Sequence, residues 1–227
     1  MIKIENLTKS YRTSSGRHFV FKDLNLTLPG GKSVALVGRN GAGKSTLLRM
    51  IGGIDRPDSG AITTNKTISW PVGLTGGFQG SLSGRENVKF VARLYAKHSE
   101  MKEKIDFVES FAELGKYFNM PIKTYSSGMK SRLSFGLSMA FDFDYYLVDE
   151  VTAVGDARFK EKCSRMFQER HKSASFLMVS HSLNTLKEYC DAAIFIGRDN
   201  YVNYYDSVND AIEAYLRSEN NKNTIPI

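Results

Sequence analysis

The sequence has little of what disulfide frameworks, metal motifs and membrane spans require. Its 227 residues include two cysteines, Cys163 and Cys190, and neither belongs to a CxxC pair, which excludes the common metal and redox motifs. No apolar stretch approaches the ~20 residues of a membrane-spanning helix. The start, MIKIENLTKS, lacks the apolar segment of a secretory signal. We therefore expect a chain that does not cross a membrane alone and whose thiols fit a reducing cytosol.

Charge of one sign is not concentrated anywhere along the chain. The net charge is +7, yet no run of five or more like charges occurs and no internal repeat is visible. This scatter favours a solvated basic surface, with a nearby anionic membrane surface as the second interpretation. We expect no nucleic-acid partner.

What is present is an alternation of strand and helix patterns. Strand patterns are followed by a helix pattern at residues 44–51, closed by Gly52-Gly53, and helical periodicity then fills residues 83–141. This order predicts an α/β fold with a parallel sheet flanked by helices and a helical insertion at about 83–141. The polar residues 219–227 are expected to form a flexible tail. The strand patterns cover residues 1–9, 19–28, 33–37, 145–148 and 176–179.

Residues 38–45 read GRNGAGKS, a GxxxxGKS pattern followed by Thr46. In such a loop the backbone N–H groups surround phosphate oxygens, the lysine reaches the β and γ phosphates, and the serine hydroxyl helps to hold Mg²⁺. A buried strand pattern precedes the loop and a helix follows, which is the context that this motif requires. The predicted phosphate-binding residues are Gly38, Arg39, Asn40, Gly41, Ala42, Gly43, Lys44, Ser45 and Thr46.

Two acidic residues end a later strand pattern, in the sequence YYLVDE at 145–150. A strand end beside a phosphate loop is where a Mg²⁺-coordinating carboxylate belongs, so we assign Asp149 to the metal and Glu150 to polarising the attacking water. Taken alone, the two acids could instead cap the next helix. His181 follows another strand pattern and could donate to a γ-phosphate, although isolated histidines are usually structural.

The order of these motifs resembles the ATP-binding cassette family over nearly the whole chain. Residues 125–129, YSSGM, stand where the family has its LSGGQ signature. The resemblance implies a P-loop NTPase fold that spans residues 1–218. Its parts are a RecA-like parallel-sheet core, an N-terminal antiparallel β subdomain and an α-helical subdomain. It also implies that ATP is held between two subunits, with the signature of one binding the γ-phosphate held by the other. The signature residues with that role are Ser126, Ser127 and Gly128.

The resemblance implies roles for three further residues. Asp156, in AVGD, stands at the acidic position of the dimer-contacting D-loop, and Tyr11 stands where an aromatic residue stacks on adenine. A core aromatic at a strand end is the other interpretation of Tyr11. Gln79 is the candidate glutamine ligand of Mg²⁺ and the γ-phosphate. It lies closer to the helical segment than is usual, so it could also be an ordinary loop residue. Ser127 and Met129 replace the family's glycine and glutamine.

Within the family, several segments resemble exporters of bacterial surface polysaccharides, and most of all the capsular-polysaccharide type of Gram-negative bacteria. O-antigen and teichoic-acid exporters share much of the pattern. Some of them carry a further C-terminal carbohydrate-binding domain, for which we expect no room here. The segments are residues 70–73 (WPVG), 76–78 (GGF), 84–87 (GREN) and the YSSGM signature.

This resemblance implies a complete working assembly. ATP and Mg²⁺ are the expected cofactors. The expected partners are a second copy of the chain, two copies of a membrane permease and the capsule export machinery, at the cytoplasmic face of the bacterial inner membrane. Residues 73–87 and the adjacent helices would receive the permease.

Two other function classes remain open at this point. The first is a soluble ABC ATPase acting on DNA or ribosomes, but such proteins usually carry two cassettes or coiled-coil arms. The second is a non-hydrolytic regulatory module, against which Lys44, Asp149, Glu150 and His181 argue.

Overall fold

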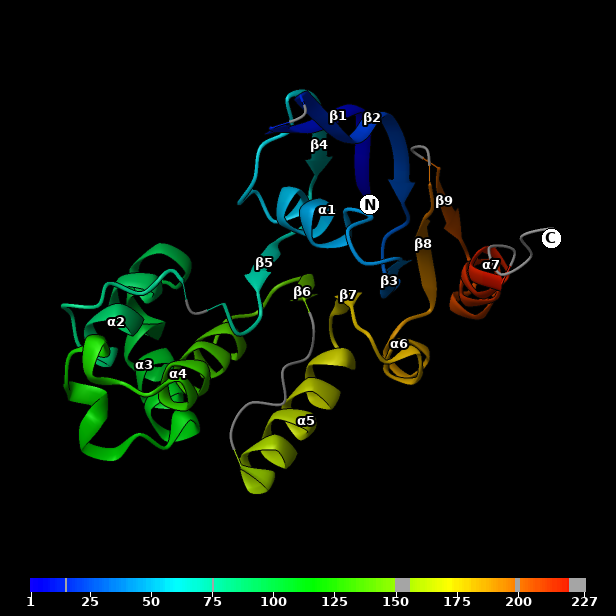
Figure 1. The fold of residues 1–227 in the computed structure, drawn as a ribbon. Coiled ribbons are helices and arrows are strands. Elements are labelled where there is room, and N and C mark those ends of the chain that lie inside the picture. The colour runs from blue at the N-terminus through cyan, green and yellow to red at the C-terminus, as the bar shows by residue number, and fades with distance from the viewer. Residues whose placement is uncertain (15, 75, 150–155, 199–200, 221–227) are drawn as a thin grey trace. The chain divides into compact units, whose positions relative to one another are not determined.

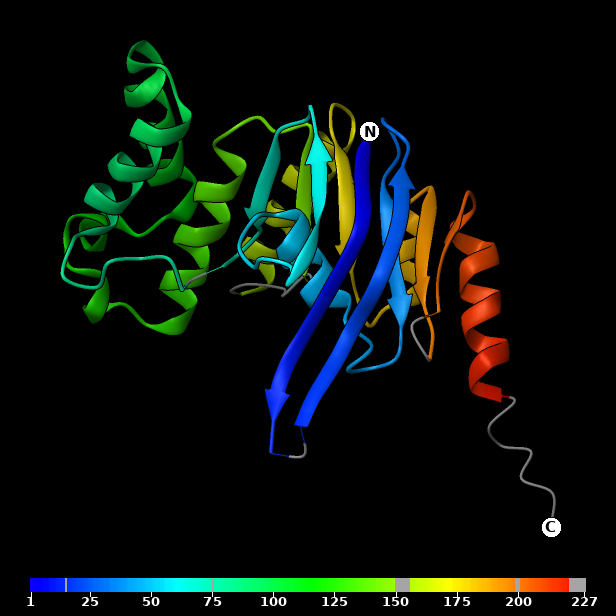
Figure 2. The ribbon, with the colours of Figure 1, turned by 90° about the horizontal axis from the view of Figure 1, so that it is seen from above.

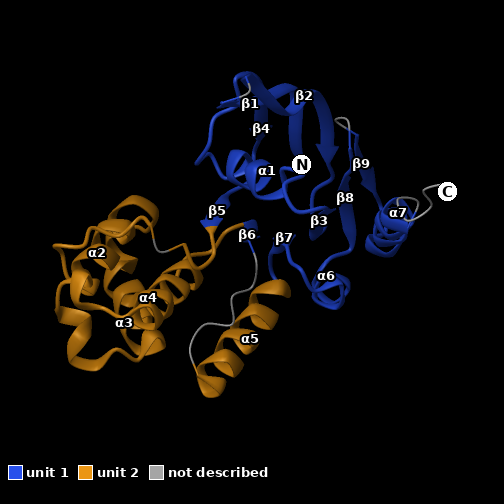
Figure 3. Cartoon of the chain, viewed as in Figure 1, with its two compact units in different colours: residues 1–70, 144–151, 173–227 blue, residues 71–143, 152–172 orange. Residues whose placement is uncertain are grey.

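The computed structural model describes residues 1–14, 16–74, 76–149, 156–198 and 201–220. The chain forms two compact units (Figures 1 and 3). The first comprises residues 1–70, 144–151 and 173–227, and the second comprises residues 71–143 and 152–172. Among the described residues, no helix has both the length and the apolar character needed to span a membrane.

Two sheets build the first unit. A three-stranded sheet has the order β2-β1-β4, and β1 pairs antiparallel with both neighbours. A six-stranded sheet has the order β5-β6-β7-β3-β8-β9, in which β6, β7, β3 and β8 run parallel and β9 runs antiparallel to β8. The strands are β1 (Ile2–Thr13), β2 (Gly16–Leu28), β3 (Val34–Gly38), β4 (Ser59–Thr64), β5 (Ile68–Pro71), β6 (Tyr145–Asp149), β7 (Ser175–Val179), β8 (Ala192–Ile196) and β9 (Val202–Tyr205).

The burial of each strand follows from its sequence. At the start of β1, Ile2 and Ile4 are buried while Lys3 between them is exposed, as alternation in a half-buried strand requires. Strand β3 is buried from Val34 to Val37, which is the pattern of a central parallel strand. The long antiparallel ribbon of β1 and β2 is visible in Figure 2. These observations confirm the expected α/β fold with a parallel core and an N-terminal antiparallel sheet.

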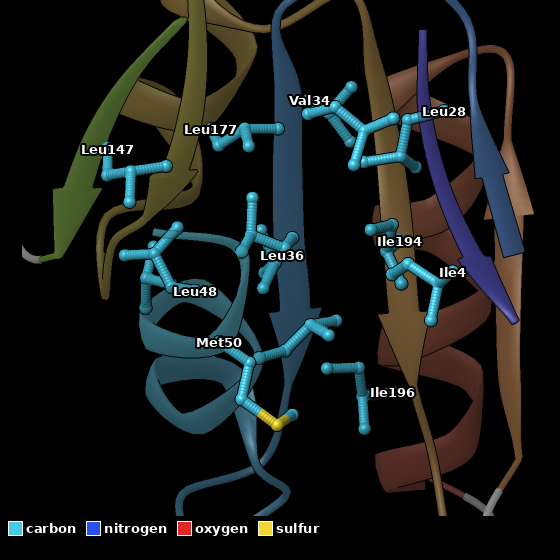
Figure 4. Packing of buried hydrophobic residues seen from close by; sticks show 14 of the residues in the cluster. Ile4, Leu28, Val34, Leu36, Leu48, Met50, Leu147, Leu177, Ile194 and Ile196 are labelled. Carbon is cyan, nitrogen blue, oxygen red and sulfur yellow. The ribbon is translucent and has the colours of Figure 1, made fainter. Parts of the chain in front are cut away.

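A single hydrophobic core joins the two sheets and the helix that follows the phosphate loop. Leu36 of β3, Leu48 of α1 (Lys44–Ile51) and Ile194 of β8 belong to one buried cluster, shown in Figure 4. Helix α1 is therefore packed against the sheet along most of its length. The phosphate loop thus lies between two buried elements, β3 and α1. The remaining helices of this unit are α6 (Leu183–Tyr189) and α7 (Val208–Asn220).

Helix α7 packs on β8 and β3. It continues through Glu219 and Asn220, which were expected from their polar character to belong to a flexible tail. Glu219 forms an ion pair with Arg39 of the phosphate loop at 3.2 Å (Oε1 to Nε). Residues 221–227 lie outside the described part of the chain.

The second unit is helical. Rings on three of its helices pack together: Phe111 lies 5.6 Å (ring centroids) from both Phe135 and Phe159. This contact brings the helix of residues 157–171 into the same compact unit as the expected 83–141 insertion. Its α-helices are α2 (Gly84–Tyr95), α3 (Met101–Ala112), α4 (Ser127–Met139) and α5 (Ala157–His171), and its short 3₁₀ turns are η1 (His98–Glu100), η2 (Gly115–Asn119) and η3 (Ile122–Thr124).

Candidate nucleotide site

The loop between β3 and α1 is held in shape by its glycines. Gly43, the residue before the helix, has φ of +103°, a conformation that favours glycine. A β-carbon at this position would lie 2.5 Å from Cγ1 of Val20 and 2.8 Å from Cζ of Phe21. Both conditions exclude a side chain, so the loop can fold tightly against β2 only because this residue is glycine.

Helix α1 begins without a side-chain cap. In α2, α4, α5 and α6 the N-cap side chain accepts a hydrogen bond from a first-turn N–H group, whereas the N-cap of α1 is Gly43 and has no side chain. The first-turn N–H groups of a helix need acceptors, and a phosphate oxygen can supply them. The start of α1 is therefore suited to bind an anion.

The side chain of Lys44 turns back onto the backbone of the phosphate loop. Its ammonium donates to the carbonyl oxygens of Gly38 at 2.7 Å and Arg39 at 2.8 Å. Burial lowers the pKa of this lysine, and the Asp149 carboxylate opposes the shift. These two carbonyls hold the ammonium of a residue that lines the cavity described below, where phosphate oxygens could replace them as acceptors.

Ser45 and Asp149 meet beside that lysine. The Ser45 hydroxyl donates to Oδ1 of Asp149 at 3.0 Å, which joins the first turn of α1 to the end of β6. Both groups offer hard oxygen ligands, and Mg²⁺ in phosphate sites typically takes one or two protein oxygens together with water and phosphate. The two residues therefore fit a magnesium ion.

These groups line one cavity of about 460 Å³. It brings together nine of the residues that were predicted from sequence: Tyr11, Asn40, Gly41, Gly43, Lys44, Ser45, Thr46, Asp149 and His181. Of the remaining predicted loop residues, Gly38 and Ala42 do not line it, and Arg39 lines a separate cavity of about 190 Å³ with Glu219.

Tyr11, on β1, lines the cavity, and two charged residues that do not line it hold its ring. Its hydroxyl donates to Oδ2 of Asp55 at 2.8 Å, and the Lys9 ammonium donates to Oδ1 of the same carboxylate at 2.6 Å. Lys9 is 8% exposed and its nitrogen lies 5.1 Å from the centroid of the Tyr11 ring. The tyrosine is therefore not a core aromatic: it is 38% exposed and held at the cavity by two buried or half-buried charges.

Four lining residues were missed by sequence reasoning: His18, Val20, Val179 and Ser180. His18 reaches the cavity because it pairs directly with Tyr11 across the β1–β2 ribbon. The turn before Gly16 and the alternating pattern on either side of it were the available signal. Val179 and Ser180 precede His181 at the end of β7, at the sheet edge where β6 also ends.

The remaining predicted residues lie in the second unit or outside the described residues. Ser126 is the N-cap of α4, and its Oγ accepts from the N–H of Met129 at 3.2 Å, while Ser127 and Gly128 form the first turn. Asp156 caps α5 and pairs with Arg132 at 2.7 Å. The backbone N–H of Gln79 donates to Asn87. Glu150 and the other D-loop residues, 153–155, lie outside the described part of the chain.

The model of the ABC transporter family matches residues 21–153, more than half of the chain. The chain belongs to the ABC transporter family. The matched stretch contains the phosphate loop, the signature segment (residues 125–129) and the acidic end of β6. Of the cavity residues, the loop residues from 40 to 46 that line it and Asp149 lie within this stretch.

Named relatives extend the likeness to almost the full length. The polysialic acid transport ATP-binding protein KpsT of Escherichia coli is 78% identical over 95% of this chain and 96% of its own. The capsule polysaccharide export ATP-binding protein CtrD of Neisseria meningitidis serogroup B is 43% identical over 95% of this chain and 98% of its own.

A solved structure shares the fold. The ATP-binding cassette MJ0796, a dimer in a post-hydrolysis state with ADP and Pi, superimposes with a TM-score of 0.73. The superposition covers 92% of this chain and 99% of that one, with 22% sequence identity.

Proposed function

We propose that this protein is the ATP-hydrolysing subunit of an ABC exporter that moves capsular polysaccharide across the bacterial inner membrane. The observation that carries the proposal is the joining of Lys44, Ser45 and Asp149 in one cavity, in a chain 78% identical over 95% of its length to a polysialic acid transport ATP-binding protein. The cavity supports the ATPase activity, and the relatives support the class of molecule that is transported.

Each residue of the cavity has a role in this proposal. Tyr11 stacks on the adenine ring, and the loop N–H groups with Lys44 bind the β and γ phosphates. Ser45 and Asp149 would hold Mg²⁺, which neutralises charge on the phosphates when bound. Glu150 polarises the attacking water and His181 contacts the γ-phosphate.

The engine is proposed to work as a dimer of two copies of this chain. Ser126, Ser127 and Gly128 of one subunit contact the γ-phosphate held by the other. The Ser126 hydroxyl accepts from the N–H of Met129 and still has a proton to donate, so it can bind a phosphate oxygen without losing its cap. Asp156 starts the helix that follows the D-loop. Gln79 is proposed as a further ligand of Mg²⁺ and the γ-phosphate.

A permease pair is the proposed membrane partner. The segment of residues 73–87 and helix α2 carry exposed apolar side chains: Leu82 is 37% exposed, Phe90 59% and Leu94 64%. Phe90 and Leu94 are one helical turn apart and therefore lie on the same face. Such a face on the second unit is suited to receive a cytoplasmic helix of a permease.

Hydrolysis tests the ATPase and the dimer together. We expect MgATP turnover by the purified protein to rise faster than linearly with protein concentration, because two subunits complete each site. The Glu150→Gln variant should bind ATP and lose most turnover, at least about 100-fold, because a general base typically contributes that much. Strictly linear turnover would exclude the dimer, and full turnover by the variant would exclude the assigned base.

Export tests the cargo and the permease surface. In an Escherichia coli strain that lacks its own KpsT, this chain should restore surface polysialic acid, and Lys44→Ala should not. The double variant Phe90→Ser/Leu94→Ser should lower export while leaving ATP binding unchanged. Ile54→Ser, which alters an apolar side chain 47% exposed on the first unit, is the matched control. Export lost equally in the control would remove the case for α2 as the contact surface.

A further inference from the structure

In the segment of residues 79–87, here called the Gln79 loop, one buried side chain, that of Asn87, bonds to both ends of the loop backbone. Asn87 is 5% exposed, and its Oδ1 accepts from the N–H of Gln79 at 2.8 Å. Its Nδ2 donates to the carbonyl oxygens of Gln79 at 3.1 Å and Ser83 at 2.9 Å. A buried amide with this many partners fixes the loop against the first turn of α2.

The Gln79 loop is paired with the segment that enters the signature. The N–H of Ile122 donates to the carbonyl of Leu82 at 2.9 Å, and the N–H of Lys123 donates to the carbonyl of Gly80 at 2.9 Å. Ser83 and Pro121 form an antiparallel bridge beside these bonds. A displacement of one segment would therefore act on the other through these bonds.

Directly after the paired residues, Gly84 faces Tyr125. A β-carbon on Gly84 would overlap with the Tyr125 hydroxyl oxygen and would lie 3.1 Å from the carbonyl oxygen of Phe118. The tyrosine is 6% exposed, and its hydroxyl donates to the carbonyl of Tyr117 at 2.6 Å. Its position is thus fixed by α2 on one side and by the 3₁₀ turn η2 on the other.

The residue after this tyrosine is the signature serine. Ser126 caps α4 directly beyond Tyr125, so a shift of the ring moves the cap and the first turn of α4. The family's signature has leucine where this chain has tyrosine. Leucine has no hydroxyl to bind Tyr117, so the anchor on η2 is a property of this sequence.

We propose that Gly84 and Tyr125 form a contact that positions the signature serine from the start of α2. Displacement of the Gln79 loop or of α2 passes through this contact to Ser126, and so to the phosphate that Ser126 binds. Tyr125 is a positioning residue. The inference rests on the proposed function, in which α2 receives the permease and Ser126 contacts ATP of the partner subunit.

The test replaces Gly84 by alanine in the Glu150→Gln background, where ATP is bound and not turned over. The added methyl group would overlap with the Tyr125 hydroxyl oxygen, so the tyrosine or the start of α2 must shift. We expect the affinity of the ATP-driven association between subunits, measured by sedimentation, to fall about 10-fold. The affinity of the isolated subunit for ATP should stay unchanged. The N–H of Met129, which Ser126 caps, should exchange with deuterium faster in the same variant.

Two further variants make the result specific. Tyr125→Phe removes the hydroxyl that the methyl group meets, so the double variant Gly84→Ala/Tyr125→Phe should associate better than Gly84→Ala alone. Gly80→Ala is the matched control: its β-carbon would have no neighbour closer than 3.8 Å, in the same loop. It should associate like the parent protein.

The outcomes separate the inference from the function on which it rests. A parent protein that fails to associate with ATP overturns the proposed dimer and this inference with it. A parent that associates while Gly84→Ala associates equally well, with unchanged exchange at Met129, overturns the inference alone. Absence of rescue by Tyr125→Phe also overturns the inference alone, because the damage then arises elsewhere in the helix.

Discussion

At the scale of single residues, the conformation of the phosphate loop depends on a glycine that has no space for a side chain. Gly43 combines a left-handed φ of +103° with contacts that leave no space for a methyl group. Gly53, at φ +69°, has the same kind of backbone conformation and nothing within 4 Å of a β-carbon. Substituting each glycine by alanine would thus distinguish two effects: backbone strain alone at Gly53, and strain together with steric overlap at Gly43.

This pair gives a direct prediction. Gly53→Ala should lower the free energy of unfolding by about 1 kcal/mol, the usual cost of a strained φ. Gly43→Ala should cost about 2–4 kcal/mol, because overpacking against Val20 and Phe21 adds to the strain. Gly43→Ala should also weaken ATP binding, since the loop must shift. Urea unfolding measures the loss of stability in both variants, and ATP titration measures the change in affinity. If both variants lost the same stability, β2 would have moved to make room for the methyl group of Gly43→Ala.

The sequence revealed the residues of the cavity that share one local motif. GRNGAGKS carries its own geometry, so Lys44 and Ser45 were assigned before any fold was known. Lys9 and Asp55 were not, because Asp55 lies 44 residues from Tyr11 and 46 from Lys9, and these contacts depend on how β1 packs beside the segment after α1. Asn87 was missed for a related reason. A single amide has no periodic pattern to mark it.

At the scale of elements, the edge between β5 and β6 depends on one carboxylate. Asp144, the residue before β6, accepts from the Lys66 ammonium at 2.9 Å and from the N–H and hydroxyl of Thr67 at 2.8 Å each. The hydrogen bonds from Lys66 and Thr67 hold the pKa of Asp144 at about 2, well below its ordinary value of 3.8. These bonds fix the chain before β5 to the residue that precedes β6.

The stability that Asp144 supplies should depend on pH with a definite sign. Its pKa is lowered by folding, so its contribution is complete above about pH 4 and is lost as the pH falls towards 2. At pH 7, Asp144→Ala should cost about 1–2 kcal/mol, since the group is partly exposed and screened. Urea unfolding of both proteins at pH 7 and near pH 2.5 measures the difference, which should shrink at the lower pH. If the difference in unfolding free energy between the two proteins did not change with pH, the stability lost in Asp144→Ala would come from packing instead.

Element boundaries were predictable where burial and period agree. The helix at 44–51 and the strands β3, β6 and β7 were expected within a residue of their observed bounds. The end of α7 was not, because Glu219 and Asn220 are polar and their helical conformation goes with a tertiary ion pair to Arg39. The membership of α5 in the second unit was equally hidden, since it depends on Phe159 meeting Phe111 across a long stretch of chain.

At the scale of the whole molecule, the two units carry different halves of the proposed ATP site. The cavity with Lys44 and Asp149 lies in the first unit, and the signature with Ser126 lies in the second. In the proposed dimer, ATP binds to the first unit of a single subunit, whereas protection of the signature requires another copy. Binding and pairing should be separable by dilution.

Hydrogen exchange of the Glu150→Gln variant with MgATP tests this separation. At about 100 times its Kd, ATP stabilises the state that binds it by about 2.7 kcal/mol, so amides of β3 and α1 that exchange through unfolding of the first unit should slow about 100-fold at any protein concentration. Amides in the first turn of α4 should slow only when the protein is concentrated enough to pair. Lys44→Ala should show neither effect. Protection of α4 that persists in dilute protein would place both halves of the site within one subunit, and a single chain would then suffice for ATP capture.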